Sequence, residues 1–130
     1  MNVTDFNHIA INARDFDKTL SFYRDTLGFK QLNTVITEEF SATYLMIPGG
    51  SRIELFDLKG KHRQTEKTDN DVGVRHYAFT VVDVASHARA LEEAGVEIVL
   101  PCCDLGNFNA RVVLFKDPDG NILEFCEDLK

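Results

Sequence analysis

Two histidines and two glutamates recur as a His-then-Glu pair in each half of this 130-residue chain: His8 and Glu54, then His76 and Glu124. Imidazole nitrogens and carboxylate oxygens, without thiolates, are donors that suit nickel, zinc, cobalt, manganese or iron(II). Four such donors leave two positions of an octahedron for water or substrate. The quartet therefore predicts one divalent metal ion held by two imidazoles and two carboxylates.

The two pairs belong to a longer internal duplication with a period of about 70 residues. The segment FNHIAINARD, which begins at Phe6, matches VRHYAFTVVD, which begins at Val74. Farther on, LMIPGGSRIELF (45–56) matches FKDPDGNILEFC (115–126), with the turn and the glutamate in step. One duplication of this length indicates a doubled domain rather than a solenoid.

The elements that must position the quartet form two modules, at about 1–58 and 73–130, joined by a polar linker at 59–72. In the first module, Asp15 is a predicted N-cap and Gly28 follows a helix with apolar residues at helical spacing. The second module repeats this order with a helix between Asp83 and Gly95. Strands are expected at 7–12, 29–37, 40–47, 52–58, 74–81, 96–100, 110–116 and 121–127. The prediction is a single α+β domain over 1–130, built from two tandem βαβββ modules.

Strand parity supports the metal hypothesis, because neighbouring side chains on a strand point to opposite faces. Each member of the quartet alternates with bulky apolar neighbours, such as Ile53 and Leu55 around Glu54. The apolar set is expected to form the core under the helices, which leaves the quartet together on the other face. Charged side chains are rarely buried without a partner, so two glutamates and two histidines that converge on a sheet face favour a cation.

Composition excludes several classes of function. The chain is 44% hydrophobic, which suits one globular unit of this length. Its net charge of −7 and pI near 5.0 argue against nucleic acid or an anionic membrane as a partner. No apolar run approaches a membrane span and the N-terminus lacks the features of a secretion signal, so a cytoplasmic protein with a small-molecule substrate is expected.

The three cysteines, Cys102, Cys103 and Cys126, are an odd number without CxxC spacing. They indicate neither a disulfide framework nor a zinc finger, and reduced thiols are expected. Cys102 and Cys103 are placed in a loop after Pro101.

Over nearly all of its 130 residues the chain resembles the vicinal oxygen chelate superfamily, which includes glyoxalase I, methylmalonyl-CoA epimerase, extradiol dioxygenases and the fosfomycin and bleomycin resistance proteins. The segments that carry the resemblance are HIAI at His8, FYRDTLGF at Phe22, RIELF at Arg52, RHYAF at Arg75 and the closing run DPDGNILEF. The resemblance implies that the paired modules enclose a metal ion in a U-shaped cleft, often completed across a homodimer. It also implies that His8, Glu54, His76 and Glu124 are the metal ligands.

Within this superfamily the first-module glutamate separates the members. Extradiol dioxygenases and thiol-transferring fosfomycin resistance enzymes typically have a His, His, Glu set, and bleomycin-binding members generally lack the ligands. Bacterial glyoxalase I has the His, Glu, His, Glu set, so Glu54 favours a glyoxalase I-like lyase or isomerase and disfavours iron among the candidate metals. A methylmalonyl-CoA epimerase-like enzyme, an iron-dependent dioxygenase and a non-catalytic small-molecule binding or resistance protein are the alternatives.

The chemistry expected of such a site is a proton shift. A metal that holds two oxygens of a hydroxy-carbonyl compound acidifies the adjacent C–H. Glu124 is the candidate base that removes this proton, and Glu54 is its counterpart, able to deliver a proton to the neighbouring carbon.

Other residues have side chains that could take part in binding or catalysis, but simpler structural roles are expected for most of them. His62, in the linker, and His87, in the second helix, are expected at the surface, and Tyr23 is expected in the core. Arg111 is a candidate for binding an anionic substrate, with a surface ion pair as the alternative. Arg52 and Phe56 share the face of Glu54, so either could shape the pocket.

Overall fold

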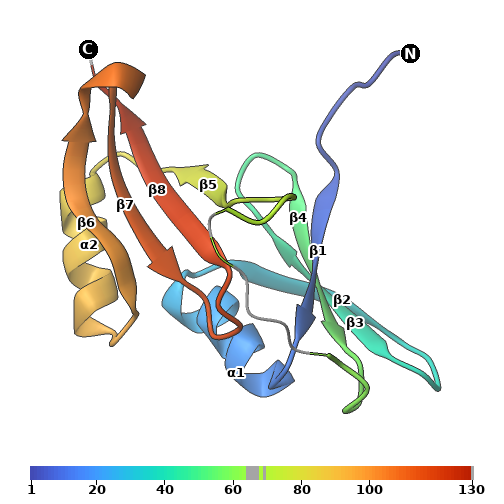
Figure 1. Ribbon diagram of the computed structural model, residues 1–130. Helices are drawn as coiled ribbons and strands as arrows, with labels where there is room; N and C mark the ends of the chain where they lie inside the picture. The colour runs from blue at the N-terminus through green and yellow to red at the C-terminus, as the bar shows by residue number, and fades with distance from the viewer. Residues whose placement is uncertain (64–67, 69, 130) are drawn as a thin grey trace. The chain divides into compact units, whose positions relative to one another are not determined.

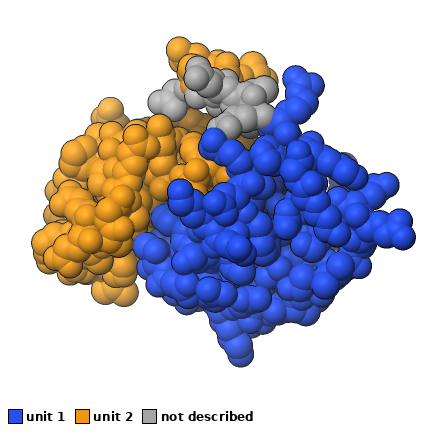
Figure 2. All heavy atoms as spheres, turned by 90° about the horizontal axis from the view of Figure 1, so that it is seen from below, with its two compact units in different colours: residues 1–64 blue, residues 65–130 orange. Residues whose placement is uncertain are grey.

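The structure is a computed structural model that describes residues 1–63, 68 and 70–129. The chain divides into two compact units, residues 1–64 and 65–130, which are coloured separately in Figure 2. The predicted linker at 59–72 includes residues 64–67 and 69, and the second module was predicted to end at residue 130; these positions lie outside the described residues.

The first unit is a four-stranded mixed sheet with one helical segment (Figure 1). Its elements are β1 (His8–Ala13), α1 (Phe16–Ser21), a turn of π-helix η1 (Phe22–Thr26), β2 (Lys30–Ile36), β3 (Ser41–Met46) and β4 (Arg52–Asp57). The strand order is β1-β4-β3-β2, in which β1 pairs with β4 in parallel and the other pairs are antiparallel. The crossover through α1 is what makes the first pair parallel.

The second unit repeats this arrangement with the strand order β5-β8-β7-β6. Its elements are β5 (Tyr77–Thr80), α2 (Val84–Glu93), β6 (Ile98–Leu105), a short 3₁₀ turn η2 (Gly106–Phe108), β7 (Ala110–Lys116) and β8 (Ile122–Asp128). Again the first strand pairs in parallel with the last, β5 with β8. Two βαβββ modules in tandem confirm the predicted α+β class.

Local chemistry explains where the helices and turns begin and end. The Asp15 and Asp83 carboxylates accept hydrogen bonds from backbone N–H groups in the first turns of α1 and α2, as N-caps do. The turn before β8 is organised by Asp117, whose Oδ1 accepts from the backbone N–H groups of Asp119 and Asn121, each at 2.9 Å. Gly120 in this turn has φ of 89°, which glycine adopts without steric cost.

The core of each unit lies on the helix-covered face of its sheet. In the first unit Tyr23, Ile53 and Leu55 are fully buried, which confirms the core position expected for Tyr23. In the second unit α2 contacts β6, β7 and β8, and its inward residues Val84, Ala88 and Leu91 are buried. These buried apolar side chains do not lie on the opposite face of either sheet.

Three sequence-based boundaries were wrong. The strand predicted at 74–81 begins only at Tyr77, because its partner β8 starts at Ile122, after the turn at 117–120. The strand predicted at 96–100 extends to Leu105 through Pro101 and both adjacent cysteines, which were placed in a loop. β6 is an edge strand with irregular register around Pro101, the setting in which a sheet tolerates proline. The first helix ends at Ser21 and continues as the π-turn.

Among the described residues, no helix is both long enough and apolar enough to pass through a bilayer.

Candidate metal-binding site

His8 and Glu54 meet on the sheet face opposite the core of the first unit. β1 and β4 are parallel neighbours in which Ala10 is paired with Glu54, so His8, two residues before Ala10, lies on the same face as Glu54. The His8 Nε2 atom is 3.7 Å from Glu54 Oε1. The His8 side chain is 37% exposed and that of Glu54 13% exposed, so the carboxylate is the more enclosed partner.

Asn7 fixes the orientation of the His8 ring. The Asn7 Oδ1 atom lies 2.7 Å from His8 Nδ1 and also accepts a hydrogen bond from Arg52 at 2.8 Å. A guanidinium can only donate, which identifies the Asn7 atom as the acceptor and makes Nδ1 of His8 the donor. The neutral imidazole then has its lone pair on Nε2, the nitrogen that faces Glu54. This is the tautomer that a metal ligand requires.

Tyr44 is the second polar neighbour of Glu54. β3 and β4 are antiparallel with Tyr44 directly opposite Glu54. The interaction of the Tyr44 hydroxyl with the Glu54 carboxylate, followed by burial, raises the pKa of Tyr44. The phenol is therefore protonated at neutral pH, and its hydroxyl is a donor beside this carboxylate.

His76 and Glu124 form the corresponding pair in the second unit. Ala78 in β5 is paired with Glu124 in β8, and His76 stands two residues before Ala78, as His8 stands before Ala10. The His76 Nε2 atom is 3.4 Å from Glu124 Oε2, and the two side chains are 30% and 16% exposed. The Nδ1 atom of His76 is buried without a hydrogen-bond partner in the described part of the chain.

The surroundings of the two pairs differ. Leu114 lies opposite Glu124, at the register position that Tyr44 has in the first unit. Two residues farther along β8 is Cys126, whose thiol lies 3.8 Å from the backbone oxygen of Phe79. Burial, and then the charges of Glu124 and Asp128, raise the pKa of this thiol. The two carboxylates of the quartet are thus not in equivalent environments.

The donor atoms within each pair suit a shared cation. Bonds of 2.0–2.2 Å from nitrogen and carboxylate oxygen to a zinc-like ion place adjacent ligand atoms roughly 3 to 3.6 Å apart, depending on the geometry. The His76–Glu124 separation of 3.4 Å falls within this range, and the His8–Glu54 separation of 3.7 Å lies just above it. The structure brings the quartet together as two pairs, one in each unit, and the described residues contain no group of three or more candidate metal ligands. The assignment of all four residues to one ion stays a prediction.

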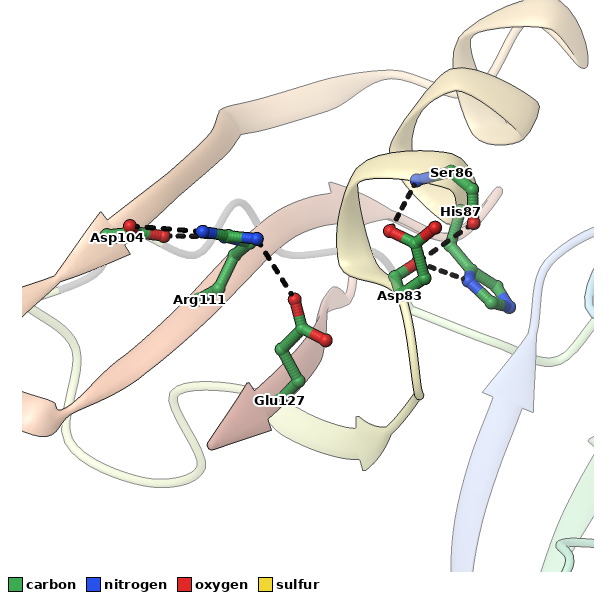
Figure 3. A network of polar contacts seen from close by, with 6 residues as sticks. All are labelled: Asp83, Ser86, His87, Asp104, Arg111 and Glu127. Carbon is green, nitrogen blue, oxygen red and sulfur yellow. Dashed lines mark hydrogen bonds and ion pairs between the residues drawn. The ribbon is translucent and has the colours of Figure 1, made fainter. Parts of the chain in front are cut away.

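The other residues considered in the sequence lie away from the quartet. Arg111 is held by Asp104, with Nε 2.6 Å from Oδ1, and by Glu127 at 3.5 Å (Figure 3). Since Arg111 is paired with Glu127, three residues from Glu124, it lies on the opposite sheet face, and the ion-pair alternative is the one observed. His87 is exposed, and its Nδ1 lies 2.7 Å from the backbone oxygen of Asp83.

Of the remaining candidates, only Arg52 contributes to the site, through Asn7 and Tyr44. Phe56 packs instead on Phe40, with ring centroids 5.3 Å apart. His62 is partly buried. Asn7 and Tyr44 were not predicted from the sequence, although the turn at 48–50 contained the signal for Tyr44. Strands that fold back about residue 49 bring positions 44 and 54 face to face.

A cavity of about 310 Å³ adjoins His76 in the second unit. Its lining includes Arg75, Tyr77, Lys116 and Asn121 beside His76. Lys116 is also paired with Glu97, at 3.4 Å.

Comparisons with known proteins bear on the whole chain. Residues 5–125 match the family model described as Glyoxalase/Bleomycin resistance protein/Dioxygenase superfamily. The Bacillus subtilis (strain 168) protein YwkD is 33% identical over 130 residues, which are 98% of this chain and 99% of YwkD. The Escherichia coli (strain K12) protein YaeR is 31% identical over 129 residues, 98% of each chain. A solved glyoxalase family protein from Enterococcus faecalis superposes with a TM-score of 0.82 at 29% identity, covering 95% of this chain and 97% of the other.

Proposed function

The chain belongs to the glyoxalase/bleomycin resistance protein/dioxygenase superfamily, and from this membership and the repeated His–Glu pair we propose that it is a metal-dependent lyase or isomerase of the glyoxalase I kind. The reaction is a proton shift next to a metal-chelated carbonyl in a small oxygenated substrate. Relatives named lactoylglutathione lyase support this choice, among them one from Haemophilus influenzae that is 24% identical over 126 residues, 93% of this chain and 90% of that protein. YwkD and YaeR are named without an activity.

The observation that carries the proposal is the equivalent placement of the two His–Glu pairs. In each unit the glutamate is paired with an alanine, and the histidine stands two residues before that alanine. A protein that only sequesters a compound has no need of the same two donors twice. We propose that these four side chains together hold one nickel, zinc, cobalt or manganese ion.

Glu124, Glu54 and His8 each have their own role in the proposed proton shift. When bound, the ion would withdraw electrons from a substrate carbonyl and make the neighbouring C–H more acidic. Glu124, which has no hydroxyl donor opposite it, takes the proton from that carbon. Glu54 takes up a proton from solvent and delivers it to the adjacent carbon, while Glu124 releases its proton to solvent. His8, oriented by Asn7, remains a neutral ligand throughout.

The test is proton exchange. Protein purified without chelators is screened against hemithioacetals and acyl-CoA epimers in deuterated water, where turnover should place deuterium on the carbon between the two oxygens. Glu124→Gln should lower turnover by about 10²-fold or more while its amide oxygen retains much of the metal. Glu127→Gln, on the same strand but paired with Arg111 on the other face, is the matched control and should exchange at the wild-type rate.

Three outcomes would contradict the proposed reaction. Unchanged turnover of a confirmed substrate in both Glu124→Gln and Glu54→Gln would show that no carboxylate of the quartet moves protons. Tight binding without label or product would favour sequestration. Oxygen consumption coupled to substrate loss would favour the dioxygenase.

We also propose a homodimer in which each metal ion takes one His–Glu pair from each chain. The supporting observation is that each unit supplies only two ligands. Mixing inactive His8→Ala protein with inactive Glu124→Ala protein should restore activity, because one of the two sites in a hybrid dimer then has all four ligands. A strictly monomeric protein in sedimentation would refute this assembly.

A further inference from the structure

Tyr44 lies on the metal-ligand face of the first sheet, directly across from Glu54. The neighbouring pair in the same ladder, Leu45 and Ile53, is fully buried in the core, so Tyr44 and Glu54 point together to the other face. Directly opposite residues have Cβ atoms about 4.5–5.5 Å apart, which lets the two side chains interact. The interaction of the Tyr44 hydroxyl with the Glu54 carboxylate raises the pKa of Tyr44, so the hydroxyl stays protonated and is able to donate to that carboxylate.

The phenol ring of Tyr44 is itself held in place. The Arg52 guanidinium carbon lies over the ring, 4.9 Å from its centroid. The His8 ring meets it edge-on, with centroids 6.3 Å apart and planes at 83°. Arg52 is in turn fixed by its hydrogen bond to Asn7, so the same small network orients both His8 and Tyr44.

The second unit lacks this arrangement. At the equivalent register position it has Leu114, which has no donor to offer Glu124. A restraint built only around Glu54 is not needed to fold a βαβββ module, since the second module folds without it. Its role therefore concerns the carboxylate rather than the sheet.

We propose that Tyr44 is a positioning residue that acts through Glu54: its hydroxyl occupies one carboxylate oxygen and thereby presents the other to the metal ion. This inference rests on the proposed function in that it takes Glu54 to be a ligand. It makes Glu54 the restrained carboxylate of the quartet and leaves Glu124 the freer one. Residues that orient metal ligands commonly change metal affinity by 10- to 100-fold when they are replaced.

The experiment is a titration of metal-free protein with Co²⁺, without substrate. Tyr44→Phe, which keeps the ring and removes the hydroxyl, should weaken Co²⁺ binding by about tenfold or more and alter the visible Co²⁺ absorption spectrum. The matched control is Thr43→Val, which removes a hydroxyl from the adjacent position. Thr43 is buried on the core-facing side of β3, and its hydroxyl is hydrogen-bonded to that of Thr34 in β2, so this variant should bind Co²⁺ as the wild type does.

A double-mutant cycle shows whether Tyr44 acts through Glu54. In a Glu54→Ala background, Tyr44→Phe should cause no further loss of Co²⁺ affinity. An equal loss in both backgrounds, or wild-type affinity in Tyr44→Phe, would overturn the inference. Wild-type protein that binds no Co²⁺ would overturn both the inference and the metal site. A cycle that behaves as expected in a protein that turns over no substrate would refute only the proposed reaction.

Discussion

The Asn7 side chain should control metal affinity through His8, although it does not itself contact the ion. Its Oδ1 atom is 2.7 Å from His8 Nδ1, and this contact keeps the lone pair of the ring on Nε2. Asn7→Ala removes the acceptor, so the ring can rotate and populate the other tautomer. The metal-free protein should remain folded, because both His8 and Asn7 are exposed at the start of an edge strand.

The size of the effect follows from one hydrogen bond at a partly exposed site. A hydrogen bond between uncharged groups contributes about 0.5–1.5 kcal/mol, which corresponds to roughly 2- to 12-fold in affinity. The His8 side chain is 37% exposed, so water can replace part of the lost bond. We therefore expect Asn7→Ala to weaken Co²⁺ binding by about 3- to 10-fold. Asn7→Asp, which keeps an acceptor oxygen, should bind Co²⁺ at least as tightly as the wild type.

Competition with a chromophoric chelator at constant pH measures these affinities. Asn33→Ala is the control, since Asn33 is exposed on β2, the far edge strand of the same sheet, and should leave Co²⁺ affinity unchanged. Wild-type affinity in Asn7→Ala would show that the Asn7 contact does not orient His8. A loss in Asn7→Asp as large as in Asn7→Ala would exclude the hydrogen bond as the cause.

Two further predictions concern groups with shifted pKa values. Hydrogen bonds from Ser86 lower the pKa of Asp83 at the N-terminus of α2. The charge of Asp83 therefore stabilises the folded state at pH values above the unfolded-state pKa of about 3.9. This stabilisation is lost as the pH falls through the pKa of the folded state. Asp83→Asn should thus have a lower melting temperature than the wild type at pH 7, and this difference should shrink below about pH 4. A difference in melting temperature that calorimetry finds to be the same at both pH values would contradict this. Burial raises the pKa of Cys126, whereas Cys102 is exposed. Iodoacetamide at pH 8 should label Cys102 before Cys126 in peptide mapping, and the reverse order would be contrary to the structure.

The sequence predicted the two modules because their signals are local. Alternation with period 2 distinguishes Glu54 from Ile53 and Leu55, and helix caps such as Asp15 and Asp83 act within one turn. Because the sequence is duplicated, each helix or strand of one module was also predicted independently from the matching segment of the other. These features do not depend on how distant strands pair.

What the sequence did not predict depends on strand pairing. His76 stands outside β5 because the partner strand begins only at Ile122, and β6 continues through Pro101 because it is an edge strand. The role of Arg111 was decided by Asp104 and Glu127, which flank it on neighbouring strands. The position of Tyr44 beside Glu54 is set by the register of β3 against β4.

Metal content is the most direct test of the quartet. Protein purified without chelators should contain about one divalent ion per complete set of four ligands, and alanine at any of the four positions should reduce that content. Glu54→Gln should lose less metal than His76→Ala, because glutamine retains an oxygen donor. His87→Ala, a histidine exposed on α2, should keep the wild-type content. If the alanine variants of His8, Glu54, His76 and Glu124 all kept the wild-type content, these four residues would not be the metal ligands.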